Sequence, residues 1–76
     1  GRNLNARQAD ILSKAIKHTG RAFTVKEIMH DYQISTNTAK TDLRGLAAIK
    51  VLAEVKQGRE ILFIAMPDIA ERLKAA

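Results

Sequence analysis

The chain has 76 residues, a length that suits one small domain. It contains no cysteine, which excludes disulfide bonds and thiolate metal sites as a source of stability, so a hydrophobic core must hold the fold together. The formal net charge of +5 favours a polyanionic partner such as nucleic acid, although many small domains are basic only to remain soluble.

The sequence carries no sign of a membrane or secretory protein. No apolar run approaches the length of about 20 residues that spans a bilayer, and no signal peptide is recognisable. We therefore expect a cytoplasmic protein without a membrane partner. The Gly-Arg start is unusual for a natural protein, so we interpret residues 1–76 as a single domain taken from a longer chain.

The first predicted element is a helix from about Ala6 to His18. Asn5 is a good residue to cap its N-terminus, and Gly20 ends it. Its apolar residues recur at helical spacing, which predicts one buried face made of Ile11, Leu12, Ala15 and Ile16.

A short strand and a second helix follow. Arg21 to Phe23 reads as a short extended stretch. Thr24 and Glu27 have the spacing of a capping box, in which the hydroxyl and the carboxylate each bond a backbone N–H group. The helix then runs to Tyr32, with an apolar face made of Val25, Ile28, Met29 and Tyr32.

A tight turn at Gln33 and Ile34 leads into a third helix, predicted for residues 35–49. Ser35 is suited to cap it. Gly45 lies inside the helix, which predicts close packing against another element because glycine weakens a helix. The apolar positions of this helix are Ala39, Leu43, Leu46, Ala47 and Ile49.

The rest of the chain predicts a β-hairpin and a last helix. Residues 51–55 and 60–64 are rich in branched side chains, and Gly58 between them supplies the positive φ of a tight turn. Both faces of the second strand are apolar, so both should be covered. A helix opened by Pro67 and Asp68 offers a cover through a stripe of Met66, Ile69, Ala70 and Leu73.

This order of elements predicts a winged helix-turn-helix, which is mainly α with a small β-hairpin (α+β). Three helices form the core, the hairpin is the wing, and a C-terminal helix follows. In such a fold the third helix presents its N-terminal end to the major groove of DNA. Ser35 is best explained as a structural cap, and Thr36 to Thr38 either face DNA or are merely solvated.

The candidate site combines one strip of the third helix with the wing tip. Asn37, Lys40, Thr41 and Arg44 lie opposite Leu43 and Leu46 on a helical wheel. Lys56 and Arg59 flank the wing turn, where they either contact phosphates or keep the tip soluble. The predicted DNA-binding residues are Thr36, Asn37, Lys40, Thr41, Arg44, Lys56 and Arg59.

No other chemistry is indicated. His18 and His30 fall in different helices without metal-ligand spacing, and each lone glycine is too little for a phosphate loop. Asp42 is expected to pair with a nearby cation, because a carboxylate facing DNA would be unfavourable. We predict no enzyme activity, no cofactor and no metal, and no small-molecule ligand is evident from the sequence.

Three stretches carry a resemblance to a known family: LNARQADIL (4–12), FTVKEIMHDYQISTNTAKTDLRGL (23–46) and VLAEVKQGREILFI (51–64). They resemble the winged helix-turn-helix of DeoR-type regulators and, more closely, the C-terminal winged-helix segment of many Fic-family proteins. The Asp42-Leu43 pair after Thr38-Ala39 is the most specific part. The resemblance implies that positions 36, 37, 40, 41 and 44 face DNA and that the wing tip contacts the backbone.

The chain departs from that family pattern in two places. Thr41 stands where DeoR-type helices usually have a second basic residue, and Lys50 stands where glycine is usual, so Lys50 should adopt the left-handed conformation. The His-Pro-Phe motif of the Fic catalytic domain is absent, so this segment would not itself transfer AMP.

Two functions remain open from the sequence. The first is double-stranded DNA binding through the recognition helix 35–49 and the wing 53–64, as a regulatory module of a larger protein. The second is a protein-protein interaction or dimerisation module of a Fic-family AMP-transferase, which would use Leu62, Ile64 and the stripe from Ile69 to Leu73. The corresponding partners are DNA, a second copy of the chain, or the catalytic domain of the parent protein.

Overall fold

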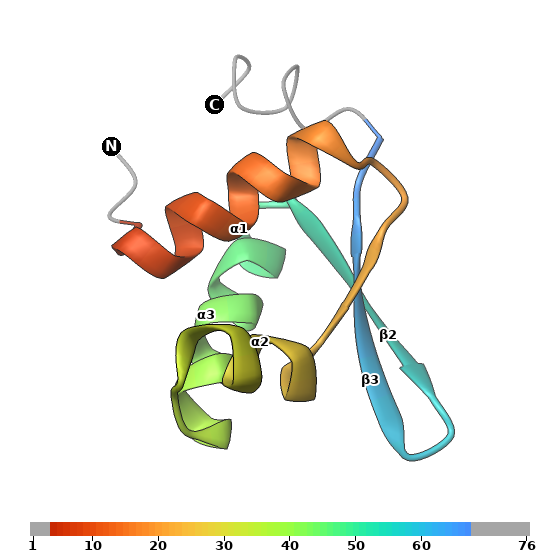
Figure 1. Ribbon diagram of the computed structural model, residues 1–76. Helices are drawn as coiled ribbons and strands as arrows, with labels where there is room; N and C mark the ends of the chain where they lie inside the picture. The colour runs from red at the N-terminus through yellow and green to blue at the C-terminus, as the bar shows by residue number, and fades with distance from the viewer. Residues whose placement is uncertain (1–3, 68–76) are drawn as a thin grey trace.

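The computed structural model describes residues 4–67, which form three helices and one antiparallel sheet (Figure 1). This confirms the predicted class, while the expected last helix lies outside the described residues from Asp68 onwards. None of the helices described is long and apolar enough to cross a membrane. The elements are α1 (Ala6–Lys17), β1 (Ala22–Thr24), α2 (Val25–Tyr32), α3 (Thr36–Ala48), β2 (Leu52–Gln57) and β3 (Glu60–Ala65).

The helices begin where their capping residues predict. The Asn5 side chain accepts a hydrogen bond of 2.8 Å from the Gln8 N–H group, and Gln8 Oε1 accepts one of 3.1 Å from the Asn5 N–H group. The start of α1 is therefore a complete capping box. Ser35 caps α3 by accepting a hydrogen bond of 3.2 Å from the Thr38 N–H group.

The capping box predicted for α2 forms differently. Thr24 Oγ1 accepts a hydrogen bond of 3.0 Å from the Glu27 N–H group, as expected. The Glu27 carboxylate was predicted to turn back to the Thr24 backbone, but it forms an ion pair with Arg21 instead. A charged partner makes the stronger hydrogen bond, so the guanidinium competes successfully for this carboxylate.

Two non-glycine residues adopt the left-handed conformation and set the geometry around α3. Gln33, at φ 54°, ends α2 and makes the tight turn into Ser35. Lys50, at φ 67°, directs the chain from α3 into the hairpin and confirms that a lysine fills this glycine-like position. Gln33 precedes α3 and Lys50 follows it, and each residue has a backbone strain of about 1 kcal/mol.

The sheet joins the hairpin to β1, in the order β1-β3-β2. The short strand predicted at residues 21–23 is shifted by one residue, and all three residues of β1 pair with β3. Phe23 lies opposite Phe63, and both side chains are fully buried. The sheet therefore closes the core with two adjacent aromatic rings facing the helices.

The core is contiguous and draws on all three helices. Its largest fully buried side chains are Phe23, Phe63, Ile11, Ile28, Leu43, Leu46 and Val51. On the outer face of the sheet, Leu62 and Ile64 are half-buried and Val55 is 41% exposed. Of the stripe predicted to cover that face, Met66 is half-buried and packs against the core, while Ile69, Ala70 and Leu73 lie outside the described residues.

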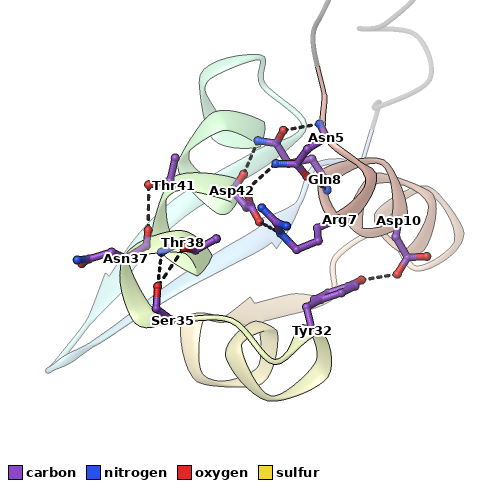
Figure 2. A network of polar contacts seen from close by, with 10 residues as sticks. All are labelled: Asn5, Arg7, Gln8, Asp10, Tyr32, Ser35, Asn37, Thr38, Thr41 and Asp42. Carbon is purple, nitrogen blue, oxygen red and sulfur yellow. Dashed lines mark hydrogen bonds and ion pairs between the residues drawn. The ribbon is translucent and has the colours of Figure 1, made fainter.

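A buried carboxylate joins α1 to α3 (Figure 2). Asp42 is only 2% exposed, and its two oxygens accept hydrogen bonds of 2.9 Å from Asn5 Nδ2 and 2.7 Å from Arg7 Nε. Its backbone carbonyl accepts a further bond of 3.1 Å from Gln8 Nε2. The hydrogen bond to Asp42 raises the pKa of Arg7. The prediction that Asp42 pairs with a cation is confirmed.

The position of the Gln8 side chain against α3 also explains why residue 45 is glycine. A Cβ atom at this position would lie 2.5 Å from Gln8 Nε2, which is too close for a side chain of any size. Gln8 has little room to yield, because it is buried and both ends of its amide are hydrogen-bonded. The predicted close packing at Gly45 is therefore confirmed, with α1 as the partner.

A second polar contact joins α1 to α2. The Tyr32 hydroxyl donates to the Asp10 carboxylate and accepts a hydrogen bond of 3.3 Å from Lys14 Nζ. The hydrogen bond from Tyr32, with a smaller effect of Lys14, lowers the pKa of Asp10. Burial, followed by the hydrogen bond to Asp10, raises the pKa of Tyr32. Since the pKa of Asp10 is lowered in the folded state, its contribution to stability is present at neutral pH and is lost as the pH falls through that pKa.

Replacing the buried carboxylate tests the joint between α1 and α3. We expect Asp42→Ala to lower the free energy of unfolding by about 2 kcal/mol, because Asn5 and Arg7 lose their acceptor. Asp31→Ala is the matched control, since this carboxylate is exposed and lies on α2, and we expect a change below about 0.5 kcal/mol. Urea unfolding measures both, and equal effects of the two substitutions would contradict the role assigned to Asp42.

Candidate nucleic-acid interface

Helix α3 has one buried face and one polar face. Ala39, Leu43 and Leu46 are fully buried against the core. The opposite face carries the polar strip predicted from the sequence, in which three residues are exposed and Lys40 is half-buried. Figure 2 shows Asn37 directed away from α1, whereas Asp42 points toward it. The strip consists of Asn37, Lys40, Thr41 and Arg44.

The hydrogen bonds of the first turns decide which polar groups remain available. Thr36 Oγ1 donates to Met29 Sδ at 3.2 Å, and Thr41 Oγ1 donates to the Asn37 carbonyl at 2.9 Å. Both hydroxyls keep only their acceptor capacity for a ligand. Within residues 4–67, no hydrogen bond engages the Asn37 side-chain amide, so this group presents both donors and an acceptor.

Ser35 behaves as the structural cap that the sequence predicted. Its hydroxyl oxygen accepts from the Thr38 N–H group at 3.2 Å, and its own proton goes to Thr38 Oγ1 at 3.0 Å. Both functions of the hydroxyl are therefore engaged within the first turn of α3. These two bonds fix the direction in which the exposed N-terminal end of the helix points.

Arg44 is held next to the hairpin. Its Nε atom lies 3.9 Å from Glu54 Oε1 of β2, and the two side chains are 56% and 40% exposed. A pair so open to solvent contributes little stability. It does place the guanidinium at the junction between α3 and the hairpin. Glu54 was missed by the sequence reasoning, because only the fold brings β2 beside this point of α3.

The hairpin tip extends the basic surface. Lys56 and Arg59 are exposed on either side of the turn, and Gly58 has the predicted positive φ, at 63°. Lys56 pairs with Ile61 in the β2–β3 register, which puts it on the face of the sheet that also carries Phe63. In Figure 1 the N-terminal end of α3 and the hairpin tip point toward the same end of the molecule.

A hollow of about 420 Å³ lies between α2, α3 and the hairpin. Lys40 and Arg59 both line it, so the structure brings together two of the predicted site residues from distant parts of the chain. Lys26 of α2 lines it as well and was not among the predicted residues. Its position follows from the fold alone, because nothing in its sequence neighbourhood indicates contact with the hairpin.

The two histidines take structural or solvated positions. His18 is the C-cap of α1, and the His30 side chain is 87% exposed, 3.7 Å from the Asp31 carboxylate. Among the residues that the structure describes, no three histidine, aspartate or glutamate side chains come together as metal ligands.

No protein-family model and no curated protein matches the sequence. Solved structures with a similar fold include BpsR and Rv0081. BpsR of Bordetella bronchiseptica, whose DNA binding is regulated by 6-hydroxynicotinic acid, superposes with a TM-score of 0.68 at 21% identity, over 96% of this chain and 53% of BpsR. Rv0081 of Mycobacterium tuberculosis gives a TM-score of 0.68 at 26% identity, over 93% of this chain and 70% of Rv0081.

These comparisons support the winged-helix architecture and leave the family open. The chain spans only about half the length of BpsR, so the activity of a whole protein cannot be transferred to it. The resemblance to DeoR-type and Fic-family segments stays a prediction, since neither comparison identifies such a relative.

The wing turn gives a direct test of how the tip is built. Gly58→Ala should destabilise the hairpin by about 1 kcal/mol, because its φ of 63° is unfavourable for a Cβ-bearing residue. Gly58→Asn should cost less, because asparagine tolerates this conformation, and no atom stands within 4 Å of an added Cβ. Urea unfolding ranks the two variants, and an alanine variant as stable as the wild type would contradict this turn geometry.

Proposed function

We propose that this domain binds double-stranded DNA, with the N-terminal half of α3 in the major groove and the β2–β3 hairpin along the flanking backbone. The observation that carries the proposal is the two-sidedness of α3. Its apolar face is fully buried, and its polar strip faces the side on which the hairpin cations lie. An α-helix fits the major groove, and the exposed end of a helix beside a wing is the usual way to place it there.

The roles of the strip follow from the available groups. The Asn37 amide can donate and accept at once, which suits the paired acceptor and donor on the edge of adenine. Lys40 and Arg44 carry charge that suits phosphate or the acceptors of guanine. Thr36 and Thr41 contribute acceptor oxygens and methyl groups, because their protons are engaged within the protein.

In this proposal the hairpin contributes positive charge to the DNA backbone and makes no base-specific contacts. Lys56 and Arg59 stand at its exposed tip, where long flexible cations follow a phosphate backbone. The similarity of the fold to BpsR, a protein with regulated DNA binding, supports the same general role here. One small module buries little surface on DNA, so we expect it to act as a dimer or within a larger regulatory protein.

Association through the sheet is the second candidate. The outer face carries half-buried Leu62 and Ile64 and the 41%-exposed Val55, a run of apolar side chains that suits a protein partner. A protein-protein or dimerisation module of a Fic-family protein would use such a surface. Amide chemical shifts separate the candidates: shifts at 36–44 and 56–59 on adding duplex support DNA, whereas shifts at 55 and 62–64 on raising the protein concentration support association.

The salt dependence of duplex binding tests the proposed interface. If Lys40, Arg44, Lys56 and Arg59 neutralise phosphates, the logarithm of affinity should fall with the logarithm of salt at a slope of about −3 to −4. Lys40→Gln should weaken binding and reduce the size of that slope by about 1. Lys17→Gln removes the same charge from the exposed face of α1 and should leave the slope unchanged.

Fluorescence anisotropy with a labelled duplex of random sequence measures these slopes. Absence of binding even at low salt would contradict the proposal. So would equal losses from Lys40→Gln and Lys17→Gln, because the effect would then come from net charge and not from the α3 surface.

Glu54 offers a test in the opposite direction. Its carboxylate lies 3.9 Å from Arg44 and faces the proposed DNA side, so it competes with phosphate for the guanidinium. We expect Glu54→Gln to raise duplex affinity about two- to fivefold. Asp31→Asn makes the same change in net charge on α2, without an ion pair to α3, and should raise affinity less. An equal gain from both variants would argue against a specific role of the Arg44–Glu54 pair.

A further inference from the structure

The hollow between α2, α3 and the hairpin has the character of a binding site for a small ligand. Its volume of about 420 Å³ lies within the range of small-molecule sites in proteins. Its apolar lining comes from Val25 and Met29 of α2 and from Ile61 of β3, all half-buried. Covering such partly exposed apolar side chains with an apolar ligand removes their surface from water, which favours binding.

The same hollow is strongly cationic. Lys26, Lys40 and Arg59 converge on it from three different elements or turns. Among the ion pairs formed within residues 4–67, none involves these three side chains. Glu60 is the one acidic residue of the lining, so the charge around the hollow remains positive by two.

Lys40 is the most informative of the three cations. It is half-buried although it is charged, as expected of a lysine whose aliphatic stem covers apolar surface while its ammonium group reaches water. Met29, which also lines the hollow, accepts a hydrogen bond of 3.2 Å from the Thr36 hydroxyl at its Sδ atom. The lining is therefore anchored to the first turn of α3.

We propose that this pocket binds a small organic anion with an apolar body and a carboxylate group. The body would lie over Val25, Met29 and Ile61, and the carboxylate would meet Lys26, Lys40 and Arg59. A phosphate of the DNA backbone accounts for the cations but not for the apolar lining, from which a hydrated phosphodiester gains nothing. Thr24 also lines the pocket, and its hydroxyl adds a donor to the carboxylate.

The ligand should also oppose DNA binding, a consequence that rests on the proposed function. Lys40 and Arg59 line the pocket and also belong to the proposed DNA surface. An anion bound between them neutralises charge that phosphates need, so the two ligands compete for the same cations.

The binding test uses three probes and the whole chain. We expect 2-naphthoate to shift the amides of residues 24–29, 40 and 59–61, while its neutral analogue 2-naphthamide binds about tenfold more weakly. Acetate, which has the charge without the ring, should also bind about tenfold more weakly. Equal binding of inorganic phosphate and 2-naphthoate would overturn the proposal in favour of a simple phosphate contact.

Two variants and a control locate the site. Lys26→Gln removes a cation that the proposed DNA surface does not use, and Ile61→Ser removes apolar lining while leaving the cations. Each substitution should lower the affinity for 2-naphthoate about fivefold. Lys17→Gln, which lies outside the pocket, should leave that affinity unchanged. Amide spectra show whether each variant is folded, and wild-type affinity in both folded pocket variants would overturn the proposal.

Competition with DNA is measured separately. Saturating 2-naphthoate should raise the apparent dissociation constant of a duplex, and Lys26→Gln should reduce that effect. If the duplex binds but 2-naphthoate leaves the pocket amides unmoved, this inference fails and the proposed function stands. If 2-naphthoate binds but the duplex does not, the pocket stands and the proposed function fails.

Discussion

The buried carboxylate of Asp42 is the constraint on which the orientation of α3 depends. A charge that is 2% exposed must be paired, and its partners Asn5 and Arg7 both come from the start of α1. The contact therefore fixes the rotation of α3 about its own axis as well as its distance from α1. A different rotation would bring this carboxylate toward the polar strip, where it would repel any polyanion.

The pairing of the other charges leads to the same asymmetry. Within the described part of the chain, the carboxylates of Asp10, Glu27 and Asp42 each meet a cation away from the polar strip. These cations are Lys14 and Arg7 of α1 and Arg21, which directly precedes β1. The cations around α3 and the hairpin tip are mostly left without such partners, apart from Arg44, which meets Glu54 loosely. Within residues 4–67, the cations around α3 and the hairpin tip that form no ion pair are Lys26, Lys40, Lys56 and Arg59, while Lys17 and Lys50 are unpaired elsewhere. Pairing therefore leaves more free positive charge near the proposed DNA surface than near the start of α1.

The features that were predicted correctly from the sequence depend on residues that are close together in the chain. The caps at Asn5 and Ser35 and the positive φ of Gly58 are decided by neighbouring residues, and each was predicted correctly. The contacts that could not be predicted join distant segments, as the ion pair of Arg44 with Glu54 does. Spacing along a helix identifies which residues share its polar face, but it does not show which strand will lie beside that face. The pocket is the extreme case, because its lining comes from two helices, β1 and the hairpin.

The position of the pocket decides what kind of control a ligand would exert. Effectors that act from a remote site need a second conformation of the protein for which they have a higher affinity. Lys40 and Arg59 lie in the pocket and on the proposed DNA surface at once, so no second conformation is required. Competition for shared cations works in a rigid domain and depends only on the two ligand concentrations and affinities. A module of this size, with α3 held firmly at Asp42 and Gly45, is suited to that direct form of regulation.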